Sequence, residues 1–67
     1  MKEQDYVMLG VSLIFRGTEF QRKCILWYMN NLQSNEDFIN ELKLFIDTQV
    51  RLGKIKPQEY GFNYVGA

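Results

Sequence analysis

The chain has 67 residues, 8 basic and 8 acidic side chains, a formal net charge of zero and no histidine. This length gives room for one small domain, residues 1–67, and the 46% apolar and 15% aromatic content is too high for an intrinsically disordered chain. The missing histidine removes the commonest general base and metal ligand, and the balanced charge is untypical of nucleic-acid binders.

The first predicted element is a helix over about residues 3–16, which is apolar on nearly every side across 6–15. Arg16 followed by Gly17 is typical of a helix end, where a basic side chain meets the negative end of the dipole and glycine adopts the left-handed conformation. Periodicity alone does not distinguish a buried strand from a buried helix here, so an α+β fold with strands at 6–15 and in the tail is the alternative. A helix that is apolar all round needs cover on all sides.

A second helix is predicted over about residues 19–32. Thr18 followed three residues later by Gln21 matches a capping box, which marks a helix start. Because this start comes directly after the first helix ends, the two helices should form a tight antiparallel hairpin. The apolar side chains of this segment cover a wide arc: Phe20, Cys24, Ile25, Leu26, Trp27, Tyr28, Met29 and Leu32.

A third helix is predicted over about residues 35–52, with Ser34 as its N-cap and Gly53 at its end. Asp47 and Arg51 have the spacing of an ion pair on one helical face. One amphipathic stripe faces the expected core: Phe38, Ile39, Leu42, Phe45, Ile46 and Val50.

The tail, residues 53–67, contains Pro57, which suits the first position of a single helical turn. Its last part has strand-like composition but no obvious pairing partner. The fold class predicted from these elements is all-α: a helical hairpin, a third amphipathic helix packed across it, and a short C-terminal tail.

Because a chain this short has only a small core, we expect it to need a stabilising partner. Cys24 is the only cysteine, so neither an internal disulfide nor a thiolate metal cage can form. Self-association or docking on a larger protein remains, and we expect a homo-oligomer, most simply a homodimer. The apolar run 6–15 is too short to span a bilayer and no targeting signal is visible, which predicts a cytoplasmic protein without membrane contact.

Candidate catalytic and metal-binding residues have simpler structural interpretations. Cys24 has no histidine to activate it and lies among apolar residues, where a thiol is usually an inert core group. Glu36, Asp37 and Glu41 are more typical of a solvated helix start than of a cation site. The sequence therefore predicts a non-enzymatic protein with no metal and no cofactor.

A protein-binding surface is the functional hypothesis that the composition favours. The chain has ten aromatic residues and three methionines, which are types enriched at the centres of interfaces. We predict a small regulator, adaptor or inhibitor that docks on another protein, a role typical of small products of phages and mobile elements. The contact residues predicted for this surface are Trp27, Tyr28, Met8, Phe15 and Phe62.

The alternative function is a small nucleic-acid-binding regulator. Basic residues near the C-terminal end are followed by aromatic ones, a combination that can bind single strands through charge and stacking. The candidate residues for this alternative are Arg22, Arg51, Lys54 and Lys56. The small local excess of positive charge favours a protein partner over nucleic acid.

Overall fold

The structure, a computed structural model, describes residues 1–64. Its elements are α1 (Glu3–Arg16), α2 (Glu19–Asn31), α3 (Asn35–Arg51) and the 3-10 turn η1 (Pro57–Tyr60). Residues 1–64 contain no strand, so the predicted all-α fold is confirmed and the α+β alternative is wrong for segment 6–15 and for the described part of the tail. Residues 65–67 of the predicted tail lie outside the described residues.

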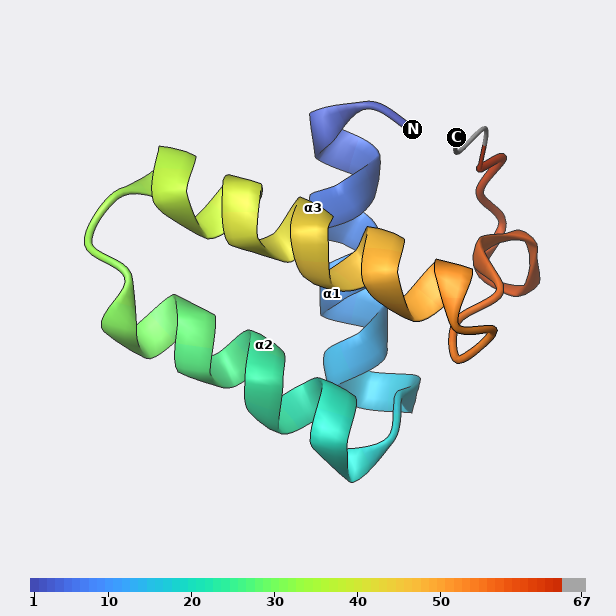
Figure 1. Cartoon of the computed structure of the whole chain (residues 1–67), viewed down its shortest axis with the longest axis horizontal. Helices are drawn as coiled ribbons and strands as arrows, with labels where there is room; N and C mark the ends of the chain where they lie inside the picture. The colour runs from blue at the N-terminus through green and yellow to red at the C-terminus, as the bar shows by residue number, and fades with distance from the viewer. Residues whose placement is uncertain (65–67) are drawn as a thin grey trace.

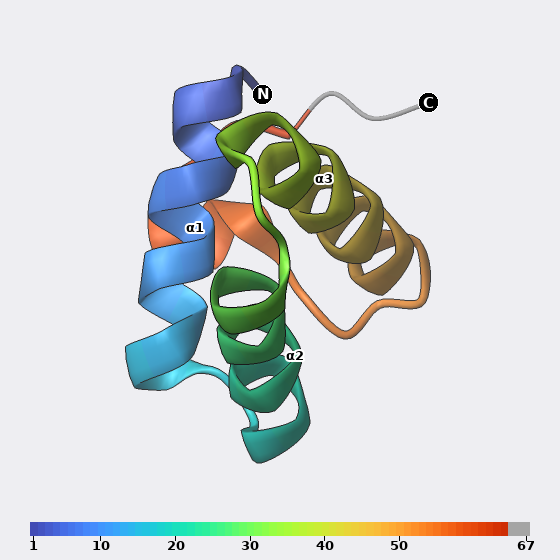
Figure 2. The same cartoon turned by 90° about the vertical axis from the view of Figure 1, so that its left-hand side faces the viewer.

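The helices are arranged in two layers. Figure 1 shows α2 and α3 running in opposite directions beside each other, with α1 crossing behind both. The antiparallel pair is therefore α2–α3, and not the pair of the first two helices predicted from the short turn between them. Figure 2 shows the same arrangement from the side, where α1 forms one layer and the α2–α3 pair forms the other. Since α2, α3 and η1 all contact α1, this helix is the element on which the rest of the chain packs.

The core lies between these two layers and is formed by side chains from all three helices and from the segment before η1. Leu9 and Leu13 of α1 are four residues apart and therefore project from the same side of the helix. Gly10 lets α3 come close, because a Cβ atom there would lie 3.2 Å from both methyl carbons of Leu42. The buried apolar side chains of the core are Tyr6, Leu9, Leu13, Ile25, Leu42, Ile46 and Ile55.

The predicted helix starts are confirmed by their hydrogen bonds. The Thr18 hydroxyl accepts from the backbone N–H of Gln21 at 3.2 Å, and the Gln21 side-chain oxygen accepts from the Thr18 N–H at 3.0 Å. The Ser34 hydroxyl accepts from the N–H of Asp37 at 3.1 Å. Gly53 follows α3 with a φ of 75°, the left-handed conformation expected of a glycine at a helix end.

Gly17 has a different role from the one predicted for it. Its backbone is extended, with φ −82° and ψ 179°, so the expected left-handed conformation is wrong. A Cβ atom at this position would lie 2.5 Å from the carbonyl oxygen of Leu13 and 2.8 Å from the side-chain oxygen of Gln21. Glycine is required here because the turn between α1 and α2 is too tight for a side chain.

Asp47 ties α1 and the tail to α3. One carboxylate oxygen accepts hydrogen bonds from the Tyr6 hydroxyl at 2.7 Å and from the Tyr64 hydroxyl at 2.8 Å. Tyr6 is buried, and this hydrogen bond satisfies its polar hydroxyl. The ion pair predicted between Asp47 and Arg51 does not occur among the described residues. A second tie holds η1, where the Arg16 guanidinium stacks over the Tyr60 ring at 4.9 Å.

These tyrosines make the fold sensitive to alkaline pH. Burial, and then the hydrogen bond to Asp47, raises the pKa of Tyr6 above its usual value near 10, and the same two causes raise the pKa of Tyr64. In the unfolded chain both phenols lose their protons near pH 10, while in the folded chain they keep them. The free energy of unfolding should therefore fall as the pH rises above about 10.

Chemical denaturation at a series of pH values measures this effect. In a Tyr6→Phe variant one of the two groups no longer titrates, so the decrease above pH about 10 should be shallower than in the wild type. Equal slopes for the two proteins would contradict the assignment.

Candidate functional site

Four aromatic rings form a continuous line along the seam between α2 and α3. Phe20 lies 6.2 Å from Phe45, measured between ring centroids, and Phe45 lies 6.1 Å from Tyr28 in an edge-on contact. Tyr28 in turn makes an edge-on contact with Trp27 at 6.1 Å. These separations and tilts are those of favourable aromatic pairs. We call Phe20, Phe45, Tyr28 and Trp27 the aromatic row.

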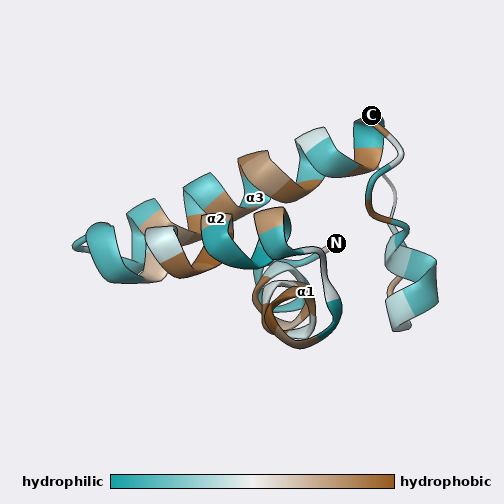
Figure 3. Cartoon of the chain, turned by 90° about the horizontal axis from the view of Figure 1, so that it is seen from below, coloured by the Kyte–Doolittle hydropathy of each residue, from teal (hydrophilic) through white to brown (hydrophobic). Residues whose placement is uncertain are grey.

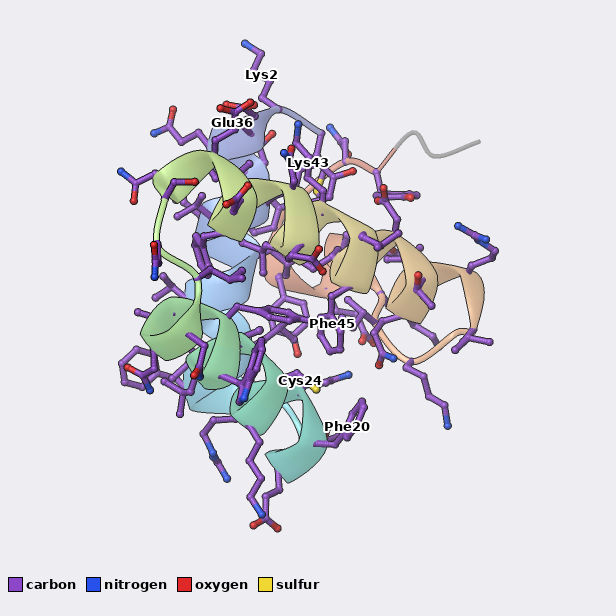
Figure 4. The ribbon with its side chains drawn as sticks, turned by 60° about the vertical axis from the view of Figure 1, so that its left-hand side comes forward. Lys2, Phe20, Cys24, Glu36, Lys43 and Phe45 are labelled. Atoms are coloured by element: carbon purple, nitrogen blue, oxygen red, sulfur yellow. The ribbon has the colours of Figure 1, made fainter. Side chains whose placement is uncertain are left out.

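The aromatic row is anchored on one side and open on the other. Phe45 and Tyr28 are half-buried, whereas Phe20 is 62% and Trp27 is 56% exposed. The opposite side of the α2–α3 pair is covered by α1, so the core uses only part of the wide apolar arc of α2. Figure 4 shows Phe20, Cys24 and Phe45 along the open seam.

The polar groups at the aromatic row are the Tyr28 hydroxyl and the neighbouring Cys24 thiol. Burial, and then the neighbouring Cys24 and Glu41, raises the pKa of Tyr28 above its usual value near 10. A tyrosine hydroxyl is neutral at physiological pH and can donate a hydrogen bond. Cys24 is a half-buried free thiol. A neutral phenol, a thiol and apolar rings suit recognition of another molecule more than acid–base or nucleophilic chemistry.

An open pocket of about 380 Å³ lies at one end of the aromatic row, lined by Thr18, Phe20, Gln21, Gln49 and Lys54. The two buried side-chain amides in its wall, those of Gln21 and Gln49, already form hydrogen bonds within the chain. The side-chain nitrogen of buried Gln21 donates to the Gln49 side-chain oxygen at 3.3 Å and to the Lys54 carbonyl at 3.4 Å. These amides hold the start of α2 against the end of α3, which positions Phe20 beside Phe45.

A second apolar surface covers the outer side of α1. Met8, Val11 and Phe15 recur at the spacing of one helical face, opposite the buried Leu9 and Leu13. Phe15 is 79% exposed, and the other two are about half exposed. Figure 3 shows hydrophobic residues on the side of α1 that faces away from α2 and α3. We call Met8, Val11 and Phe15 the α1 outer face.

The five contact residues predicted from the sequence do not form one surface. Trp27 and Tyr28 lie in the aromatic row, whereas Met8 and Phe15 lie on the α1 outer face. Phe62 belongs to neither surface, because it is half-buried and packs against the core. The prediction of a single patch is therefore corrected to two separate ones, with Phe62 a residue that closes the core.

The basic residues of the alternative function are dispersed around the end of α3. Arg51, Lys54 and Lys56 are exposed there, and Arg22 is half-buried on α2. Lys54 alone lines the pocket beside Phe20. Three exposed cations within six residues give a small positive region at this end of the chain.

Sequence reasoning missed two members of the aromatic row. Phe20 was included in the apolar arc of the second helix, and Phe45 was assigned to the core stripe of the third. Only the contact between α2 and α3 places these rings 6.2 Å apart. The sequence signal for such a surface is the apolar arc of the second helix, which is wider than one neighbouring helix can cover.

Comparison of the chain with protein-family models, with curated proteins and with solved structures finds no match. None of the helices within residues 1–64 combines the length and apolar content needed to cross a lipid bilayer. The same residues contain no group of three side chains that could hold a metal ion. Any functional conclusion therefore depends on the two apolar surfaces themselves.

Proposed function

We propose that the chain is a non-enzymatic protein-binding regulator that docks its aromatic row on another protein. The observation that carries this proposal is that Phe20 and Trp27 remain more than half exposed while they contact rings that the fold holds in place. Aromatic side chains with restricted motion lose little entropy on binding and are the commonest anchors of interfaces. Such binding is sufficient for a regulator, adaptor or inhibitor, which needs no catalytic group.

The shape of the seam indicates which kind of partner it fits. α2 and α3 lie beside each other in opposite directions, and α1 packs across only one side of the pair (Figures 1 and 2). On the open side, the aromatic row along the seam offers an apolar surface to an amphipathic helix whose large apolar side chains recur at helical spacing. Glu41 lies close to Tyr28 and would favour a basic residue on that helix.

The decisive test compares Trp27→Ala with the control Leu44→Ala. Both side chains are exposed and apolar, but Leu44 lies on α3 outside the aromatic row. A partner identified by crosslinking in the native host and then purified should bind Trp27→Ala about 30-fold more weakly, a typical loss for a central interface aromatic. Leu44→Ala should bind as the wild type does, in isothermal titration calorimetry. Equal affinity of the two variants would contradict the proposal.

Salt dependence separates this function from the nucleic-acid alternative. Docking through apolar rings should change little between low and high salt, whereas binding to phosphates weakens steeply because counterions are released. Salt-sensitive binding to single-stranded DNA that is lost in Arg51→Ala and Lys54→Ala, with Trp27→Ala unaffected, would replace the proposed function by the alternative.

A further inference from the structure

We propose that the α1 outer face binds a second copy of this chain, so that α1 packs antiparallel on α1 of the other copy. This proposal does not depend on the proposed function, because the aromatic row lies along α2 and α3. The surface, its partner and its orientation follow from three observations: the side chains along α1, the charges at its two ends, and the spacing of the apolar residues.

The α1 outer face has no charged side chain between its first and last turns. Met8, Val11 and Phe15 form its apolar stripe, and the half-buried Ser12 lies beside them. The Ser12 hydroxyl already donates to the carbonyl oxygen of Met8 at 3.1 Å, so covering it leaves no unsatisfied donor. An uncharged stripe of this kind can be buried against another helix at low desolvation cost.

The charges at the two ends of α1 select the antiparallel orientation. The first turn contains Glu3 and Asp5, and the last turn contains Arg16. Glu3 is already paired with Lys43 of its own chain at 3.4 Å, so in an antiparallel pair the acidic residue nearest Arg16 is Asp5 of the second copy. The two helix dipoles also oppose each other favourably. A parallel pair would instead bring like charges and like dipole ends together.

The spacing of the stripe is compatible with the same orientation. Residues 4, 8, 11 and 15 are separated by four, three and four positions, so the pattern is unchanged when the helix is reversed. Met8 of each copy then packs on Val11 of the other, and Phe15 of each packs beside Gln4 of the other. This register places Arg16 of each copy within two residues of the height of Asp5 of the other, on the same flank of the pair, at about 1.5 Å of rise per residue.

Sedimentation equilibrium of the full chain tests the proposal. Because three apolar side chains per copy form a small interface, we expect a dimer with a dissociation constant on the order of 10 μM. Val11→Asp buries a charge at the centre of the pair and should raise this constant at least about 100-fold. The control Leu44→Asp makes the same kind of change at an exposed position of α3 and should leave the dimer intact.

Two further variants keep the test decisive. If Val11→Asp does not fold by circular dichroism, Phe15→Ser takes its place, since its side chain is almost fully exposed in the single chain and contributes little to the fold. Arg16→Glu should weaken the dimer about 10-fold at low salt and less at high salt, whereas Arg16→Lys should not. A wild-type protein that stays monomeric to about 500 μM, far above the expected constant, or a dimer that is equally sensitive to Leu44→Asp, overturns the proposal. A dimer that Arg16→Glu leaves unchanged or tightens overturns the antiparallel orientation.

Discussion

Replacement of Asp47 by alanine should lower the free energy of unfolding by about 3 kcal/mol, because two hydroxyl groups lose a charged acceptor at once. Tyr6 is buried beneath α3, so its hydroxyl cannot turn to water when the carboxylate is removed. Tyr64 is half-buried and would release the tail rather than remain unpaired. Urea denaturation followed by circular dichroism measures the loss.

Two variants separate this effect from a general loss of acidic charge on α3. Glu41→Ala removes an exposed carboxylate from the same helix and should change the free energy of unfolding by less than about 0.5 kcal/mol. Tyr64→Phe removes only the contact to the tail and should cost about 1 kcal/mol. If Asp47→Ala is no less stable than Glu41→Ala, the two hydroxyl contacts do not stabilise the fold.

Gly17→Ala is the second substitution for which we expect a large loss of stability, about 2–3 kcal/mol. The added methyl group would lie 2.5 Å from the Leu13 carbonyl oxygen, which is a backbone atom that cannot move without opening the last turn of α1. It would also approach the Gln21 side-chain oxygen, which accepts the capping hydrogen bond from the Thr18 N–H. Thermal and urea denaturation should both show the loss.

Gly53→Ala is the natural comparison, because this glycine has a positive φ but no atom near its missing Cβ. The expected loss of stability is about 1 kcal/mol, because alanine adopts the left-handed backbone conformation less readily than glycine does. Gly17→Ala should therefore be the less stable of the two variants. The reverse order would mean that the α1–α2 turn relaxes around the methyl group and that backbone conformation is the larger constraint.

The two apolar surfaces differ in what they can bind. The aromatic row contains half-buried rings beside exposed ones and lies along the seam between two helices, which suits an apolar helix of another protein. The α1 outer face is a single uncharged stripe with opposite charges at its ends, which suits a second copy of itself. Because they lie on different helices, a dimer formed through α1 would still present two aromatic rows, a bivalent arrangement that raises the apparent affinity for a repeated partner.

Local sequence signals were sufficient to predict the helices. They did not predict interactions between residues that are distant in the chain. Thr18, Ser34 and Gly53 mark helix ends through hydrogen bonds and backbone angles within a few residues, so their roles could be predicted. Asp47 was paired with Arg51 on one face of a helix, yet its partners come from 41 and 17 positions away. The same holds for the candidate site: the sequence predicts Trp27 and Tyr28 as contact residues, but not Phe45.

The sequence by itself determined three helices with their caps and more apolar side chains than one small core can enclose. These properties depend on composition and on interactions between residues close together in the chain. Only the tertiary structure decided which apolar side chains remain outside, because burial depends on how α1 crosses the α2–α3 pair. That crossing enclosed Tyr6, packed Phe62 against the core, and separated one expected surface into the aromatic row and the α1 outer face.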